Sequence, residues 1–384
     1  MHLNVSSVLF FDFTAIRAPG TATPAGLRNT PVSLIMRKNL GYLMAKQQDM
    51  LVRERLFYLD IARAFAIFTV FLAHVYSEQL PGSYISKILF LFSPSVPMAM
   101  LAIVSAVLIT PSALKNTGDY LSRRFVRIYI PLLLCLTITF AISRINNPWG
   151  YDSTHILLHS LGLSLFFELF NVQNNAGIGY GLWFITAILM MYVTIPMQIT
   201  LFKSKHSLFY LLIMIILSTL LGVGFNTLAD FPSVFSGFFI GVYLTVNNSY
   251  AKTLNIKPSY LLILLVIGVA INYSPINIHG KWIKDLTSGV IALMMLALFY
   301  KMQKLTPYFI AKSITFFSLI SYEFYMLHFS FINEPLKRIL GISGMANQII
   351  LSIAILIPLS FVTHRVGVLL INMARSNRDI QNKN

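Results

Sequence analysis

The sequence predicts an all-α polytopic membrane protein, and three observations support that prediction. Hydrophobic residues make up 56% of the 384 residues, and charged residues make up only 11%. The mean hydropathy is +0.72, a value that excludes a water-soluble enzyme of this length. The apolar stretches are also continuous rather than alternating, which favours membrane helices over the strands of a barrel.

About ten apolar runs approach the length needed to cross a hydrocarbon core of about 30 Å as a helix. We expect transmembrane helices at 56–76, 86–110, 128–143, 182–202, 207–228, 231–247, 258–273, 285–302, 313–333 and 346–372. The segment 155–170 is shorter and carries His155, His159 and Glu168. We expect this segment to form a re-entrant or interfacial helix within a long loop.

Topology explains the formal net charge of +16 better than nucleic-acid binding does. With ten spans and a cytoplasmic N-terminus, 19 Lys and Arg residues from Arg37 onward fall in cytoplasmic segments, and six fall outside. This asymmetry satisfies the positive-inside rule and predicts that both termini are cytoplasmic. The three tryptophans, Trp149, Trp183 and Trp282, then lie at the outer interface, which amphipathic rings prefer.

The first 50 residues differ in composition from the rest of the chain. They contain a stretch rich in Pro, Gly and Thr at 18–30, and they lack the basic region that opens a signal peptide. We expect residues 1–50 to be either a disordered extension or the result of a start placed upstream of Met50. Residues 51–373 then form the transmembrane domain, and residues 374–384 form a cytoplasmic tail.

The first span carries a polar stripe. Arg63 and His74 are eleven positions apart, and at about 100° per residue they point in nearly the same direction. Asp60 and Glu78 fall on the same side. A lone histidine in an apolar helix is usually structural, and Asp60 lies close enough to the cytoplasmic face to reach water. Together the four residues predict a catalytic face, with His74 as general base and Glu78 orienting its ring.

An arginine pair and a histidine late in the chain are further candidates for binding. Arg124 and Arg127 share a helix face at the cytoplasmic entrance, a geometry able to grip phosphates, although basic flanks are ordinary at that position. His328 lies sixteen residues after Lys312 and reaches the depth of His74, where it either binds a substrate or hydrogen-bonds another helix. Glu323 lies deeper and must be protonated or paired, for example with Arg63.

These residues resemble the acyltransferase-3 family of integral membrane acyltransferases, which move acyl groups, commonly acetyl, onto extracytoplasmic glycans and related hydroxyl acceptors. The resemblance covers about residues 52–372. It rests on Leu59-Asp60-x-x-Arg63 with His74, on Val96-Pro97 to Ser105, on Arg124 with Arg127, on Leu182-Trp183-Phe184, on Phe235-x-Gly237 to Gly241, and on Ser321-Tyr322-x-x-Tyr325-x-Leu327-His328.

The chain also departs from the family pattern. Ser105-Ala106 stands where the family usually has Ser-Gly, and Ala64 follows Arg63 where Gly is common. In the tenth span the frequent Glu-x-Pro ending is replaced by Thr363-His364-Arg365, so no role is transferred from that region.

The resemblance implies that the protein lies in a bacterial cytoplasmic (inner) membrane. Its donor would be acyl-CoA, most commonly acetyl-CoA, and its acceptor a glycan or lipid-linked saccharide. The implied donor-phosphate ligands are Arg124 and Arg127, with Arg63. His74 would act as base or as acyl carrier. The implied acceptor-side residues are His328, Tyr325, Trp183 and Glu323.

A transporter or flippase of lipid-linked saccharides is the alternative function, since it also needs charges inside the membrane. Such a protein would move its substrate unchanged and would not require acyl-CoA.

The single cysteine, Cys135, lies inside an apolar run and cannot form an intramolecular disulfide, and the sequence contains no zinc ligand set. We therefore expect no metal cofactor.

Overall fold

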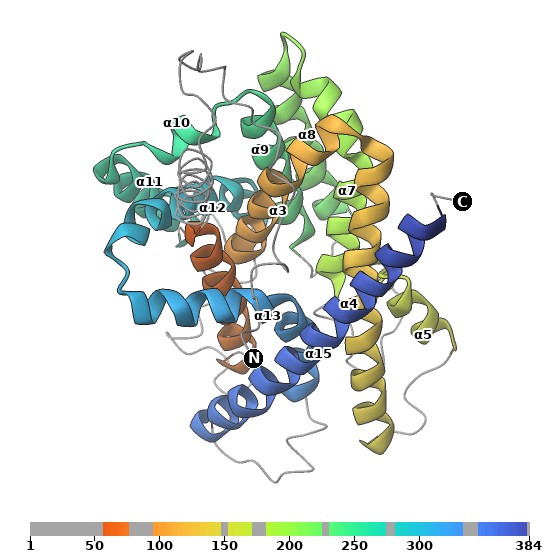
Figure 1. Ribbon diagram of the computed structural model, residues 1–384. Helices are drawn as coiled ribbons and strands as arrows, with labels where there is room; N and C mark the ends of the chain where they lie inside the picture. Colours follow the sequence, from red (N-terminus) through yellow and green to blue (C-terminus); the bar gives the residue numbers. More distant parts are fainter. Residues whose placement is uncertain are drawn as a thin grey trace, which may run out of the picture. The chain divides into compact units, whose positions relative to one another are not determined.

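A computed structural model describes residues 57–76, 95–146, 153–170, 182–224, 230–273, 281–332 and 345–381 (Figure 1). All regular elements within these ranges are helices, as the continuous apolar runs predicted. The first helix is Phe57–Tyr76. It is followed by α3 (Ser95–Lys115), α4 (Thr117–Asn146), α5 (Ser153–Ser160), α6 (Leu165–Leu169), α7 (Trp183–Phe202), α8 (Ser207–Gly224), α9 (Phe231–Val246), α10 (Tyr250–Leu254), α11 (Pro258–Tyr273), α12 (Lys281–Met302), the 3-10 helix η3 (Gln303–Leu305), α13 (Tyr308–Ile332) and α15 (Met345–Gln381). The expected extension 1–50 and Glu78 lie outside the described residues.

Seven helices in the described part of the chain are long and apolar enough to cross a membrane. They are the Phe57–Tyr76 helix, α3, α4, α7, α8, α12 and α15. The other three expected spans coincide with α9, α11 and α13, which are not among the seven. Helices α9 and α11 have 16 residues each, fewer than the about 20 that a perpendicular span needs. Helix α13 carries Lys312, Glu323 and His328, which lower its hydropathy. The expected count of ten spans is therefore not established.

Helices α3 and α9 pack together in the interior of the bundle. Helix α9 also contacts α7, α8 and α12, and nearly all of its side chains are buried. Gly237 and Gly241 allow the close approach, because a Cβ on Gly237 would collide with the backbone of Ala99. A Cβ on Gly241 would lie 2.7 Å from Cβ of Ala106. Small residues four apart commonly allow membrane helices to approach this closely.

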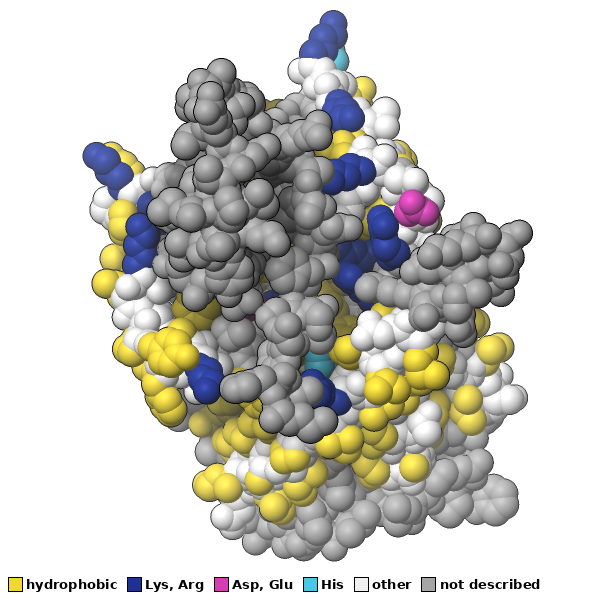
Figure 2. Space-filling view, in the orientation of Figure 1, with side chains coloured by type: hydrophobic (Ala, Val, Ile, Leu, Met, Phe, Trp, Pro, Cys, Tyr) yellow, Lys and Arg dark blue, Asp and Glu magenta, His cyan; other side chains and the backbone are white. Residues whose placement is uncertain are grey.

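Other helices expose apolar side chains on the outside of the bundle. Most large side chains of α8 are exposed, and α4 and α15 also bury only a minor part of their apolar windows. On the face shown in Figure 2, Lys and Arg side chains gather toward the top of the view, and apolar side chains dominate the lower part. This distribution is typical of a protein whose sides contact lipid and whose basic residues lie near one membrane surface.

The segment expected to be re-entrant or interfacial forms two short helices, α5 and α6, joined by a tight corner. Gly162 has φ +70°, and a side chain there would also strike Leu189. Thr186 on α7 holds the corner, because its hydroxyl donates 2.6 Å to the Gly162 carbonyl and accepts from the Leu165 amide at 3.1 Å. With eight and five residues, neither helix is long enough to cross a bilayer.

His159 lies inside this corner. Its side chain is fully buried, its Nδ1 lies 2.9 Å from Ser164 Oγ, and its ring centroid is 4.9 Å from that of Phe167. Its Nε2 has no hydrogen-bond partner within the described ranges. Burial, and next the nearby His155, lower the pKa of His159 to about 4.

Substituting Gly237 with Val should destabilise the α3–α9 contact, because the added side chain meets the Ala99 backbone, which cannot move aside. Overpacking of this kind costs about 1–3 kcal/mol. The thermal unfolding midpoint of the purified protein in detergent measures the effect. Gly224→Val is the control, since a Cβ there meets nothing within 4 Å. Equal midpoints for the two variants would contradict the described helix contact.

Acidification should weaken the α5–α6 corner. The pKa of His159 is about 4 in the fold and about 6.5 for an exposed histidine, so the unfolded chain binds more protons between these values. The stability contributed by neutral His159 is present above about pH 6.5 and declines as the pH falls toward 4, by on the order of 2–3 kcal/mol. Melting curves of wild type and His159→Gln should diverge over this range, with the wild type losing more. If the melting temperatures of the two proteins fell in parallel with pH, neutral His159 would not be the source of this pH dependence.

Candidate functional site

The N-terminal half of the Phe57–Tyr76 helix presents an ion pair to α13. Arg63 Nη1 lies 3.9 Å from Asp60 Oδ1, one turn earlier on the same helix, and the two side chains are 27% and 25% exposed. Ser318 Oγ on α13 donates a hydrogen bond of 2.8 Å to the same carboxylate oxygen. Asp60 therefore links its own arginine to a second helix.

His74, near the other end of this helix, contacts a second histidine from α13. The ring centroids of His74 and His328 are 5.4 Å apart, with an interplanar angle of 41°. His328 is buried, and its Nδ1 contacts the backbone carbonyl of Tyr325. A carbonyl oxygen only accepts, so we assign the proton to Nδ1, and Nε2 of the neutral ring is then the acceptor. The contact agrees with the expectation that His328 reaches the depth of His74.

Aromatic side chains extend from this histidine pair to the start of α7. The ring of Tyr325 lies 5.5 Å from that of His328 and 5.7 Å from that of Phe184. Trp183 is in edge contact with Phe184 at 6.2 Å. Four of the residues predicted from the sequence, His74, His328, Tyr325 and Trp183, thus belong to one continuous group of rings.

Arg124 lies near the N-terminal end of α4, in a cluster of hydroxyl groups. It interacts electrostatically with Tyr120, Tyr192 and Arg63. The hydroxyl of Tyr192 on α7 is hydrogen-bonded to Ser105 Oγ on α3 at 2.5 Å. Arg127 follows one turn later on α4 and is half-buried. The structure therefore associates Arg63 and Arg124, which are far apart in the sequence.

Arg63 and His74 define two ends of one polar helix face. Eleven residues at 1.5 Å each separate them by about 16 Å along the axis. On α13, Ser318 contacts Asp60, the ion-pair partner of Arg63, and His328 contacts His74 itself. The arrangement therefore offers a cationic end and an imidazole end, both lined by the same pair of helices.

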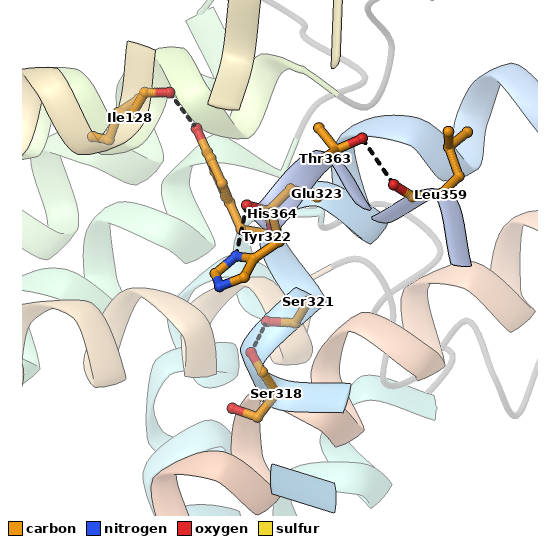
Figure 3. A network of polar contacts seen from close by, with 8 residues as sticks. All are labelled: Ile128, Ser318, Ser321, Tyr322, Glu323, Leu359, Thr363 and His364. Atoms are coloured by element: carbon orange, nitrogen blue, oxygen red, sulfur yellow. Dashed lines mark hydrogen bonds and ion pairs between the residues drawn. The ribbon is translucent and has the colours of Figure 1, made fainter. Parts of the chain in front are cut away.

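Glu323 is paired, as one of the two expectations had it, and its partner is His364 rather than Arg63, which was given as an example. Its Oε1 lies 3.0 Å from His364 Nδ1 on α15, and the two side chains are 3% and 14% exposed (Figure 3). Glu323 lies five residues from both Ser318 and His328, about 140° around the helix from each. Its side chain therefore leaves α13 on a different face, which packs against α15 and α4.

Hydrogen bonds around Glu323 extend this second polar face. Tyr322 donates its hydroxyl to the carbonyl oxygen of Ile128 on α4 at 3.3 Å (Figure 3). Cys135 on α4 is close enough to Glu323 to interact with it electrostatically. Glu323 Oε2 and His364 Nε2 are buried without a hydrogen-bond partner in the part of the chain that the structure describes.

The structure adds residues that the sequence did not single out, namely Ser318, Tyr120, Tyr192 and, most clearly, His364. In the sequence, His364 stands out only as a departure from a family pattern. A polar side chain inside an apolar run was the feature of the sequence from which His364 could have been identified as a paired residue. Within the described ranges, no group of three or more His, Cys, Asp or Glu residues is arranged to hold a metal ion.

Comparison with known proteins gives one informative match. The family model described as an acyltransferase domain, that of the acyltransferase-3 family, matches residues 56–365. No curated protein and no solved structure matches the chain. The matched range begins just before the Asp60–Arg63 pair and ends just after His364, so it contains all the contacts described above.

Removing either member of the Glu323–His364 pair should destabilise the protein, because the remaining buried polar group loses its partner. We expect Glu323→Leu and His364→Leu each to lose roughly 1–3 kcal/mol of unfolding free energy. The double variant should lose less than the sum, since neither polar group is then left alone. Unfolding of all four proteins in a denaturing detergent titration measures this coupling, and strictly additive losses would argue against a direct pair.

Proposed function

The chain belongs to the acyltransferase-3 family, and on that premise we propose that it transfers an acetyl group from acetyl-CoA to a hydroxyl of a glycan or lipid-linked saccharide. The family and the apolar helices make it a membrane acyltransferase. The donor, the acyl group and the acceptor are the parts that we propose. We also propose that it lies in a bacterial cytoplasmic membrane with both termini in the cytoplasm, as its basic loops suggest.

The contact between His74 and His328 is the observation on which the proposed chemistry rests. Two imidazoles side by side in an apolar bundle supply both a proton acceptor and a proton donor at neutral pH. The Tyr325 carbonyl fixes the orientation of His328, so that its Nε2 is left as the acceptor. Acyl transfer to a hydroxyl needs a base at the acceptor oxygen, which His74 provides in this proposal.

The transfer step then balances in atoms and charge. The neutral imidazole of His74 takes the proton of the acceptor hydroxyl as its oxygen attacks the thioester carbonyl carbon. The carbon–sulfur bond breaks, and the CoA thiolate takes the proton back from His74. In a second route His74 itself attacks the thioester and expels the CoA thiolate, which takes the proton of the imidazole. The acceptor hydroxyl then displaces the acyl group from His74, and the hydroxyl proton returns to the ring.

The arginines suit the donor. Guanidinium groups bind phosphate oxygens through paired, charge-assisted hydrogen bonds. In our proposal Arg124, Arg127 and Arg63 hold the phosphates of acyl-CoA, while the pantetheine arm extends along the first helix toward His74. On the acceptor side we propose His328, Tyr325 and Trp183. Glu323 is not part of this acceptor group in the proposal, because its side chain pairs with His364 on another face of α13.

Loss of His74 or Arg63 should abolish acetylation of cell-surface glycans. Removing a general base lowers the rate by about 10²–10⁴-fold. We would measure the O-acetyl content of surface glycans in a deletion strain that expresses wild type, His74→Ala or Arg63→Ala, with membrane insertion verified by blot. His206→Ala is the control, since His206 is exposed on the α7–α8 connection.

Wild type and the control should restore acetylation, and the two site variants should not. Full acetylation by an inserted His74→Ala protein would rule out the role of His74. A flippase would instead move a saccharide unchanged in membranes free of acyl-CoA, so donor dependence in vesicles separates the two functions.

Radiolabelled acetyl-CoA separates the two roles of His74. If His74 carries the acyl group, wild type incubated without acceptor should retain label, and His74→Ala should not. If His74 acts only as base, neither protein should retain label above background, although wild type remains active when acceptor is added. The label on protein precipitated from the reaction is the quantity to measure.

A further inference from the structure

Tyr120 on α4 buries a hydroxyl group that has no hydrogen-bond partner among the described residues. Its side chain is 1% exposed and is among the largest fully buried side chains. A buried hydroxyl without a partner destabilises the folded state, and phenylalanine would fill the same space without that penalty. Stability of the fold therefore does not explain why this position carries a tyrosine rather than a phenylalanine.

The surroundings of this hydroxyl are cationic. Arg124 follows Tyr120 by one turn on the same face of α4, and the two interact electrostatically. Arg63, from the first helix, is also within electrostatic range of Arg124. Guanidinium groups form charge-assisted hydrogen bonds with the oxygens of anionic ligands.

Neighbouring groups already have partners. Tyr192, whose ring centroid is 6.3 Å from that of Tyr120, is hydrogen-bonded to Ser105. The Asp60 carboxylate is held by Ser318 and Arg63. The Tyr120 hydroxyl is therefore the donor that these described contacts leave unused. Beside guanidinium groups, the natural acceptor for it is an oxygen of an anionic ligand.

We propose that the Tyr120 hydroxyl donates a hydrogen bond to a phosphate oxygen of a ligand that Arg124 and Arg63 bind. A phosphate offers several oxygens, so it can accept from α4 and from the first helix at the same time. The inference rests on the proposed function insofar as acyl-CoA is the expected source of that phosphate. The same chemistry is available from the headgroup of an anionic phospholipid.

The variant Tyr120→Phe tests the proposal, because binding and structural roles predict opposite results. If the hydroxyl binds phosphate, the variant keeps or raises its thermal unfolding midpoint but binds CoA roughly 10- to 100-fold more weakly. Tyr129→Phe is the matched control on the same helix, where the hydroxyl donates to the Leu161 carbonyl at 2.7 Å. That variant should lose stability and keep its affinity for CoA.

The measurements are isothermal titration and thermal unfolding of the full-length protein in lipid-free detergent. The probes are CoA, pantetheine, which has no phosphate, and phosphatidylglycerol. Weaker binding of CoA by Tyr120→Phe, with no difference for pantetheine, supports the proposal. In another outcome, wild type does not bind CoA, and phosphatidylglycerol raises the unfolding midpoint of wild type more than that of Tyr120→Phe. The hydroxyl then binds a lipid phosphate, and the proposal that acyl-CoA is the donor is contradicted.

Two outcomes overturn the inference. In the first outcome, wild type and Tyr120→Phe bind CoA with equal affinity. The proposal that acyl-CoA is the donor would then stand, but Tyr120 would not contribute to binding it. In the second outcome, Tyr120→Phe has a lower unfolding midpoint, but its binding of CoA and of phosphatidylglycerol is unchanged. The hydroxyl would then stabilise the folded protein rather than bind a ligand.

Discussion

Polar side chains inside an apolar bundle need partners within the protein, and this requirement organises the structure around α13. Water is scarce at membrane depth, so each unpaired charge or hydrogen-bonding group there costs several kcal/mol. On one face, α13 supplies Ser318 to Asp60 and His328 to His74. On another face it supplies Glu323 to His364. One helix thereby holds the candidate chemical groups of the first helix and anchors the last described helix.

The helices divide into those that bear candidate chemistry and those that support it. The first helix, α4, α7 and α13 carry the residues proposed for donor and acceptor binding. Helices α3 and α9 instead provide a tight backbone contact through Gly237 and Gly241. This division fits a general requirement of catalysis, namely that reactive groups be held by elements whose own packing leaves little freedom.

Local features of the site were predictable from the sequence, and contacts between helices were less so. The spacing of Arg63 and His74 placed both on one face, because helix periodicity depends only on position along the chain. The depth of His328 followed from its distance to Lys312 in the same way. The partner of Glu323 did not follow, since it depends on how α13 and α15 are rotated about their axes. Tyr120 was missed because a tyrosine beside a basic interface resembles ordinary flanking sequence. Six helix ranges were predicted to within about four residues, whereas α3, α4, α13 and α15 extend five or more residues beyond the prediction at one end. Helices α9 and α11 are too short for their apolar composition alone to establish a span.

The Glu323–His364 pair also bears on how the protein is made. The two residues are 41 positions apart, so Glu323 leaves the ribosome before its partner has been synthesised. At typical elongation rates of about 5–20 residues per second, the carboxylate waits for roughly 2–8 seconds. During that interval α13 carries a carboxyl group whose partner has not yet been synthesised. Synthesis of α15 supplies the partner, so the Glu323–His364 contact between α13 and α15 forms only after both helices have been made.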